Sequence, residues 1–398
     1  MEATTPHAGT AVALRRKELG WTQQKLATEA RLSQSLVSKL EVGDRPATHA
    51  VLALLARTLQ VPVEKLTGQP YDDGGSRDAR THDAVEQLRT VLRRAEFPAE
   101  IAPRPCDELA ADVAETAKLR QDAEYHKLLD RLPALLAEVS AAASDSSSAD
   151  RRRANLLLLH SYFAAHNVVH RLGYRDLAES IEPKLLAAAE RSGDDLAVAL
   201  AHWVRAQSFQ SAGDYRHGLA LMDTTRGGLG DEHAELTPAE LTLHGSLHLR
   251  SVTLASRAGD LDRTEEHLRT ARSLADRLNG PDQVHYGLTF GHANVTTHET
   301  AARVELGDHP GALAAAETWT PPATMARSRR GHHYIDLARA HLHSGNRAES
   351  LTALKHARSI APQQTRLHPM TRETTAVLLS LHRRSNTDLS ELATWLGL

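Results

Sequence analysis

Cysteine is almost missing from this 398-residue sequence, in which Cys106 is the only thiol. A single cysteine cannot close an intramolecular disulfide, so the chain lies outside the small disulfide-stabilised classes and fits a reducing compartment. No motif that would activate a thiol surrounds Cys106. We therefore expect an ordinary packing residue at the start of a helix.

Aromatic residues are scarce as well, at 4% of the sequence, although hydrophobic residues reach 41%. A core with few rings must be packed by Ala and Leu, as it is where helices stack on helices. No run approaches 18 apolar residues, and no charged-then-apolar signal pattern is present at the start. We therefore expect a cytoplasmic protein that does not enter a membrane.

Motifs that carry catalytic chemistry are also lacking. The sequence has no Gly-rich phosphate loop, no nucleophile elbow, and no carboxylate pair in a context that singles it out. We expect no enzymatic activity and no cofactor.

Histidine is abundant, with 24 residues, and two i, i+4 pairs could each offer two ligands to zinc. These pairs are His166/His170 and His244/His248. Neither has a third ligand nearby in sequence, and the HExxH pattern is absent. We interpret them as packed or solvated histidines and predict no metal site.

The pattern of residues 22–46 predicts two short helices joined by a tight turn. Thr22 and Ser33 are suited to cap helices that run to about Ala30 and about Glu41, and Gly43 is suited to end the second. Flanking helices over residues 9–19 and 48–59 supply further apolar side chains. The second helix buries Leu36, Val37 and Leu40 and leaves Gln34, Ser35, Ser38 and Lys39 on its other side.

Three motifs run through this stretch: Thr22-Gln23-x-x-Leu26-Ala27, then Ser33-x-Ser35-x-Val37-Ser38-x-Leu40-Glu41-x-Gly43, then Arg45-Pro46. They resemble the XRE family of lambda-repressor-like helix-turn-helix proteins over roughly residues 8–68. The resemblance implies a DNA-binding domain of five helices. It also implies that Gln23 contacts a phosphate, that Gln34, Ser35 and Ser38 approach bases, and that Lys39 and Arg45 approach bases or backbone, with Ser33 opening the recognition helix. The alternative is a five-helix module that binds only protein.

Charge is distributed in the direction that DNA binding requires. Residues 1–70 hold nine Lys or Arg against six acids, a net +3, whereas the whole chain has 47 against 50, so the remainder carries −6. A basic DNA-binding segment attached to an acidic body fits a protein that contacts DNA through one end only.

The chain beyond residue 82 is helical and repetitive. Residues 329–362 match the spacing of the tetratricopeptide repeat, with Tyr334 and Ala338 on a first helix, Gly345 at the turn and Pro362 as a stop. The same turn recurs at Gly173, Gly213, Gly259 and Gly307. Together with Gly345, successive turn glycines are 38–48 residues apart. We predict an all-α fold with three parts: a helix-turn-helix domain over 1–68, a flexible linker over 69–81, and a tetratricopeptide-like solenoid over 82–398. Within it, residues 141–149 are expected to be a flexible loop, and 370–398 a terminal cap.

Such repeats stack into a superhelix whose first helices line a concave groove. Aligning the turn glycines predicts which side chains face it. As ligand-binding candidates we take His160, Phe163, Asn167, His170, Trp203, Gln207, Gln210, Asn294 and Arg339, and we expect Leu249, Thr253, Ser256, Thr297 and Ile335 beside them. Rings beside amides suit a peptide backbone or a small polar ligand. Asn167 is the best single candidate, because the repeat position that it occupies carries a backbone-gripping Asn in peptide-binding members of the family that it resembles.

Two function classes follow. The overall pattern resembles bacterial XRE regulators with C-terminal tetratricopeptide domains, and the segment 360–374 resembles one found in a subgroup of them. The resemblance implies a homodimeric transcriptional regulator that binds an inverted-repeat operator and senses a peptide or small-molecule effector. The other class is a constitutive scaffold, in which the repeats recruit a protein partner and the N-terminal domain tethers it to double-stranded DNA.

Overall fold

The structure is a computed structural model that describes residues 7–398 except for 72–75, 96, 98–100, 146–147 and 382–385. Its N-terminal domain consists of five helices, as predicted. They are α1 (Ala8–Glu18), α2 (Gln23–Glu29), α3 (Gln34–Val42), α4 (His49–Thr58) and α5 (Val63–Thr67). Leu26, Val37, Leu52 and Leu59 are buried in their shared core. Leu14, an apolar residue of the helix predicted over 9–19, is 61% exposed and does not join this core.

The predicted caps are present. The Thr22 hydroxyl accepts from the Lys25 N–H at 3.1 Å, and the Ser33 hydroxyl accepts from the Leu36 N–H at 3.2 Å. α3 ends at Gly43, whose φ of 79° is left-handed. The two motif helices therefore begin and end within about one residue of the predicted positions.

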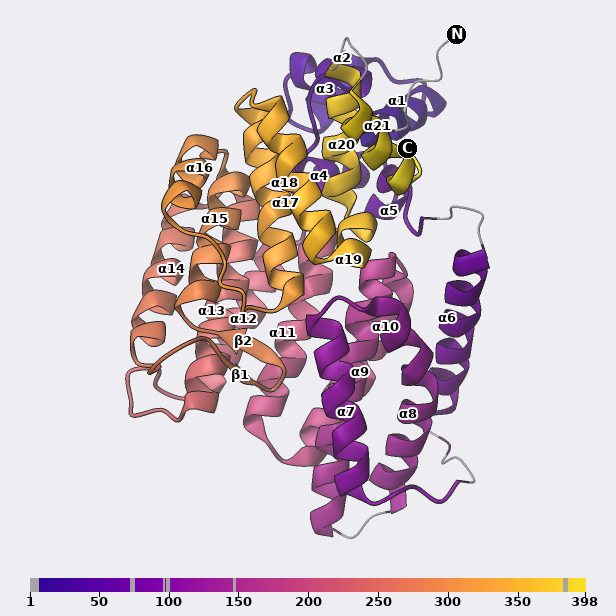
Figure 1. The fold of residues 1–398 in the computed structure, drawn as a ribbon, viewed down its shortest axis with the longest axis vertical. Helices are drawn as coiled ribbons and strands as arrows, with labels where there is room; N and C mark the ends of the chain where they lie inside the picture. The colour runs from indigo at the N-terminus through magenta and orange to yellow at the C-terminus, as the bar shows by residue number, and fades with distance from the viewer. Residues whose placement is uncertain (1–6, 72–75, 96, 98–100, 146–147, 382–385) are drawn as a thin grey trace.

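From residue 76 onward the described chain is a series of helices, most of which pack against the next in sequence (Figure 1). The first three are α6 (Ser76–Arg94), α7 (Cys106–Gln121) and α8 (Tyr125–Asp145). Then follow α9 (Ser148–Leu172), α10 (Arg175–Ser192), α11 (Asp195–Ala212), α12 (Tyr215–Gly228), α13 (Pro238–Ala258) and α14 (Leu261–Asp276). The last are α15 (His292–Leu306), α16 (His309–Thr318), α17 (Arg327–His343), α18 (Arg347–Ile360), α19 (Pro362–Leu367), α20 (Pro369–Leu381) and α21 (Thr387–Leu396).

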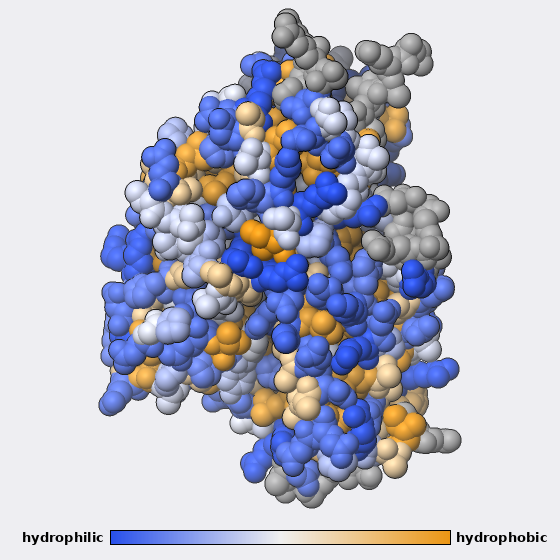
Figure 2. Space-filling model, in the orientation of Figure 1, coloured by the Kyte–Doolittle hydropathy of each residue, from blue (hydrophilic) through white to orange (hydrophobic). Residues whose placement is uncertain are grey.

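The all-α prediction is confirmed. Each predicted turn glycine lies one or two residues after the end of a helix. Residues 141–145 belong to α8 and are not part of a loop, whereas 146–147 lie outside the described residues. Figure 2 shows one face of the molecule, on which apolar residues are scattered among hydrophilic ones. None of the described helices is long and apolar enough to cross a bilayer.

A small hairpin interrupts the helical series, and the sequence analysis missed it. β1 (Gln283–His285) pairs antiparallel with β2 (Leu288–Phe290), with Tyr286 and Gly287 at the turn. The turn reaches the first helices of the repeat region: the Gly287 carbonyl accepts from Arg120 of α7, and the Tyr286 hydroxyl donates to Asp194 before α11. The hairpin therefore bridges helices that are far apart in sequence.

The C-terminal helices also contact the first helices of the helical region. In α19 the Gln364 amide oxygen accepts from the Tyr125 hydroxyl at 3.2 Å, and its nitrogen donates to the Ser328 carbonyl at 2.9 Å. Arg327 pairs with Glu124 at 3.4 Å. With the hairpin, these contacts close the expected open groove into a ring of helices around a central cavity.

The N-terminal domain is docked on the repeats, which corrects the expectation of a flexible tether. Ile335, Ala357 and Met370 join its apolar core. Gly213, at the turn after α11, has a φ of 72°, and a Cβ added there would lie 2.7 Å from the Cβ of Ala53 in α4. Ile335, predicted to face the groove, thus packs under this domain.

A buried carboxylate holds the same contact. Glu373 in α20 accepts hydrogen bonds from the backbone N–H groups of Ala8 and Ala47, each at 3.0 Å. The Ser380 hydroxyl donates to the Gly43 carbonyl at 2.6 Å. Of the expected linker, Gln69 donates to the Leu367 carbonyl at 3.4 Å, and α6 already begins at Ser76. The N-terminal domain and the repeats therefore form one packed body.

Candidate functional site

The second motif helix, α3, presents its polar face to solvent. Gln34, Ser35 and Lys39 are exposed and Ser38 is half-buried, whereas Val37 and Leu40 are buried beneath them. Ser33 is exposed too, with its hydroxyl engaged as the helix cap. α3 docks through its apolar side, so its polar side chains remain free to approach another molecule.

A buried ion pair fixes the start of α2 relative to α3. Arg16 donates two hydrogen bonds to Glu41, at 2.6 and 2.9 Å, and Gln23 donates a third at 2.8 Å. Burial raises the pKa of Glu41, but these hydrogen bonds outweigh it and the net pKa is lowered. Gln23 is thus held through Glu41, and Arg45 is exposed beyond α3. The predicted DNA contacts lie on one end of the molecule.

The second candidate site is the central cavity, with a volume of about 230 Å³. It lies inside the ring of helices, and α9, α11, α13, α15 and α17 supply most of its wall. The N-terminal domain contributes as well, through His49 of α4 and Val63 of α5. One cavity therefore touches both parts of the chain.

The structure brings six of the nine predicted ligand-binding residues to this cavity. Trp203 donates its indole N–H to the Ser246 carbonyl at 3.0 Å, and Gln207 hydrogen-bonds His170 at 3.0 Å. Asn167 has no hydrogen-bonding partner for its side chain within the described chain. The six are Asn167, His170, Trp203, Gln207, Gln210 and Asn294. Leu249, Thr253, Ser256 and Thr297 line the cavity too.

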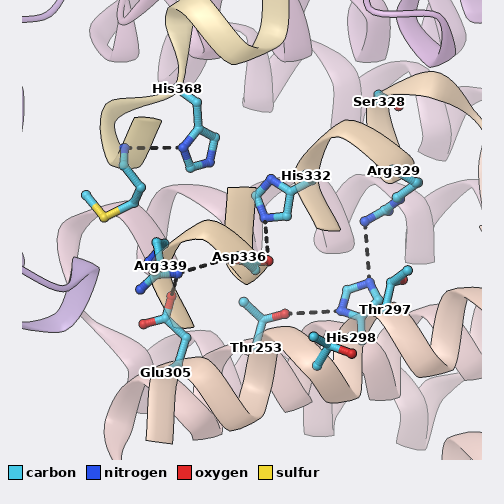
Figure 3. Close-up of polar contacts among 12 residues, drawn as sticks. Thr253, Thr297, His298, Glu305, Ser328, Arg329, His332, Asp336, Arg339 and His368 are labelled. Carbon is cyan, nitrogen blue, oxygen red and sulfur yellow. Dashed lines mark hydrogen bonds and ion pairs between the residues drawn. The ribbon is translucent and has the colours of Figure 1, made fainter. Parts of the chain in front are cut away.

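The other three predicted residues lie outside the cavity lining. His160 packs on the ring of Tyr286 at the hairpin turn, and Phe163 is buried beneath the guanidinium of Arg120, 4.3 Å from the ring centroid. The hairpin covers both. Arg339 is buried and pairs with Glu305 at 3.1 Å and with Asp336 at 3.0 Å (Figure 3). The prediction assumed an open groove, and the hairpin and these ion pairs were not foreseen.

Arginine and histidine are the most abundant side chains of the cavity, and of these only His170 was predicted from the sequence. Arg250 stacks 3.9 Å above the ring of Trp203 and donates to Gln210 at 3.0 Å. Arg329 lies 3.4 Å from His298, which Figure 3 shows pointing toward it from α15. The lining includes Arg120, Arg171, Arg175, Arg250, Arg257, Arg329, His49, His170, His298, His332, His333 and His368. Glu305 and Asp336 are the carboxylates among its lining residues.

These groups make the cavity electropositive. Burial first, and then the nearby Arg329, Arg257 and Arg171, lower the pKa of Arg250 to about 9. Burial and the nearby Arg171 likewise lower the pKa of Arg329 to about 10. Both remain cationic near neutral pH. Burial first, and the arginines second, also hold the pKa of His298 and His332 well below 6.5, so these rings are neutral when the cavity is empty.

The two histidine pairs singled out in the sequence have protein partners. His166 stacks on His170 with ring centroids 6.0 Å apart, and His170 hydrogen-bonds Ser211 at 2.9 Å. His248 bonds Glu232 at 2.8 Å, with His244 4.0 Å from the same carboxylate. Among the described residues, no three His, Cys, Asp or Glu side chains form a group that could hold a metal ion.

Comparison with known proteins bears on the N-terminal domain. Residues 12–66 match the helix-turn-helix family. Over 58 residues, 15% of this chain, the sequence is 40% identical to the competence pilus inhibition repressor of Acinetobacter baylyi. The match spans about half of that repressor, at 53% of its length. The chain therefore carries an N-terminal helix-turn-helix domain of the XRE type, joined to a long helical region.

Proposed function

We propose that this protein is a sequence-specific DNA-binding transcriptional regulator. The exposed polar face of α3 carries the proposal, since Gln34, Ser35 and Lys39 project from a helix of the right type and size for a major groove. The likeness to a repressor supports it. Two copies would pair through their repeats and bind an inverted repeat, with recognition helices about 34 Å apart.

We further propose that the cavity binds an effector that controls the DNA-binding domain. His49 and Val63 belong to that domain and line the cavity together with residues of the repeats. Arg175 of the cavity also forms an ion pair with Glu64 of α5. An occupant of the cavity can thus favour one placement of the domain over another, by as much as its affinity differs between the two. The shared wall favours a regulated protein over a constitutive scaffold.

Replacing Gln34 by Ala tests the base-reading role of α3. We expect a loss of roughly 1–3 kcal/mol of discrimination at one base position of each half-site, because a Gln amide can form two hydrogen bonds with one base edge. Selection of binding sites from random duplexes, carried out with wild type and variant, measures it. An unchanged selected sequence would show that Gln34 does not read bases.

Replacing Lys39 by Ala tests backbone contact. We expect binding to weaken to a similar degree on every sequence. The slope of log K against log salt should fall by about one for each bound domain. Lys118 in α7 is also exposed but lies on the repeats, so Lys118→Ala is the matched control and should leave the slope unchanged. Equal slopes for wild type and Lys39→Ala would remove Lys39 from the interface.

A further inference from the structure

The arginines of the cavity fall into two groups. Arg257 lies 3.6 Å from Glu305, and Arg175 pairs with Glu64. Four others, Arg120, Arg171, Arg250 and Arg329, have no carboxylate within ion-pair distance among the residues that the structure describes. We call these four the arginine quartet. They come from α7, α9, α13 and α17, so the ring of helices brings them together.

The quartet makes only neutral contacts. Arg120 donates to a backbone carbonyl, Arg250 to the Gln210 amide, and Arg329 approaches the His298 ring. For Arg171, none of the described residues serves as a hydrogen-bonding partner. The Nε atoms of Arg171 and Arg250 are buried with no acceptor. Donor capacity therefore remains unused on several sides of the cavity.

Such an arrangement is unfavourable without an anion. The four side chains are half-buried, and a cation withdrawn from water is normally paired, because desolvation costs more than neutral hydrogen bonds return. The lowered pKa values of Arg120, Arg250 and Arg329, due first to burial and then to neighbouring arginines, reflect the same cost. Four cations held without carboxylates form a binding site for negative charge.

We propose that the cavity binds a small molecule with at least two anionic groups, phosphates or carboxylates, held by the arginine quartet. The inference rests on the proposed function in that it names the chemical class of the effector. The Arg250 guanidinium carbon lies 3.9 Å from the Trp203 ring centroid, and its buried Nε has no acceptor, so this group can donate to a planar anion. Asn167 stands one turn from Arg171 on α9 with its amide free, and can bond a polar group of the same molecule.

Thermal unfolding of the full chain tests this proposal with inorganic pyrophosphate, citrate, and sodium chloride at matched ionic strength. We expect pyrophosphate or citrate to raise the Tm by several degrees beyond chloride, and the two arms distinguish phosphate from carboxylate as the preferred group. In Arg171→Gln/Arg329→Gln, titration calorimetry should show an at least tenfold weaker Kd for the bound anion. The Tm of that variant without added anion should equal or exceed that of wild type, because unpaired charge has been removed.

Arg263→Gln is the control, since Arg263 lies on the outside, paired with Asp223 at 2.9 Å. It should bind the anion as wild type does. Three results would overturn the inference: no stabilisation beyond chloride, a Kd within twofold of wild type in the double variant, or a lower Tm of that variant without anion. A gel shift on a selected operator separates the two proposals. Operator binding without anion binding refutes this inference alone, and anion binding without operator binding refutes the proposed function alone.

Discussion

Replacing Glu373 by Ala is expected to detach the N-terminal domain from the repeats. The Glu373 carboxylate is 5% exposed and accepts from the N–H groups of Ala8 and Ala47, at the start of α1 and just before α4. Without it, two buried donors lose their acceptor, at about 1–3 kcal/mol each. The carboxylate also faces the positive end of the α1 dipole. We expect docking to weaken by roughly 2–5 kcal/mol, after part of the loss is offset by the relieved burial of a charge.

Hydrogen exchange of the Ala8 and Ala47 amides measures this loss, because both are protected through Glu373 in the docked state. A weakening of about 3 kcal/mol corresponds to exchange faster by roughly a hundredfold. Glu373→Gln keeps one acceptor oxygen and should give an intermediate rate. Glu391→Ala removes an exposed carboxylate from the neighbouring α21 and should change neither amide. Unchanged exchange in Glu373→Ala would mean that docking depends on the apolar contacts alone.

The parts of the fold that the sequence predicts well are local. The Thr22 and Ser33 caps form with amides three residues away, and Gly43 ends α3 through its own backbone conformation. Such features are determined by residues close in sequence, so a local pattern of about a dozen residues is enough to predict them. Alignment of the turn glycines likewise placed Asn167 and Trp203 on the inner face of their helices, and the structure has them at the cavity. Whether they bind a ligand stays a prediction.

The missed features depend on contacts between distant segments. The Ala8–Glu373 hydrogen bond joins residues 365 positions apart, and the Arg120–Gly287 contact spans 167. No local pattern encodes either of them. An arginine on a predicted helix is normally assigned to the solvent-exposed face. Arg250 and Arg329 could therefore not be assigned to a cavity, because the cavity depends on how distant helices pack into a ring. The spacing of Arg171 four residues after Asn167 was the one available signal.

Lowering the pH from about 7.5 to about 5 is expected to destabilise the protein strongly. Burial holds the pKa of His160, His267 and His333 at about 4 and that of His343 at about 3, against 6.5 in an unfolded chain. The unfolded state therefore takes up more protons below pH 6.5. Stability from these histidines is complete above pH 6.5 and is lost as the pH falls from 6.5 toward 4. Each contributes roughly 1–2 kcal/mol of loss at pH 5.

Together these losses approach the whole stability of an ordinary domain, about 5–15 kcal/mol. Carboxyls with a raised pKa oppose the trend, because they make the folded state bind the extra proton. Among the described residues, burial raises the pKa of Glu179, Asp282, Asp336 and Glu373. Each opposes the histidines only over the pH range in which it is more protonated in the folded state than in the unfolded state. Urea unfolding at several pH values should therefore show a midpoint urea concentration that decreases as the pH is lowered below 6.5.

Single substitutions isolate the histidine contribution. The His343 ring stacks on His309 with centroids 4.4 Å apart, so His343→Phe keeps a ring there but cannot take up a proton. We expect this variant to lose less stability than wild type between pH 6.5 and pH 5, by roughly 1–2 kcal/mol. His233→Phe is the control, because His233 is exposed in the folded chain and no ion pair holds it among the described residues. If His343→Phe has the same pH dependence as wild type, burial of this ring does not couple protonation to folding. The same comparison at His333 would then test a second buried histidine.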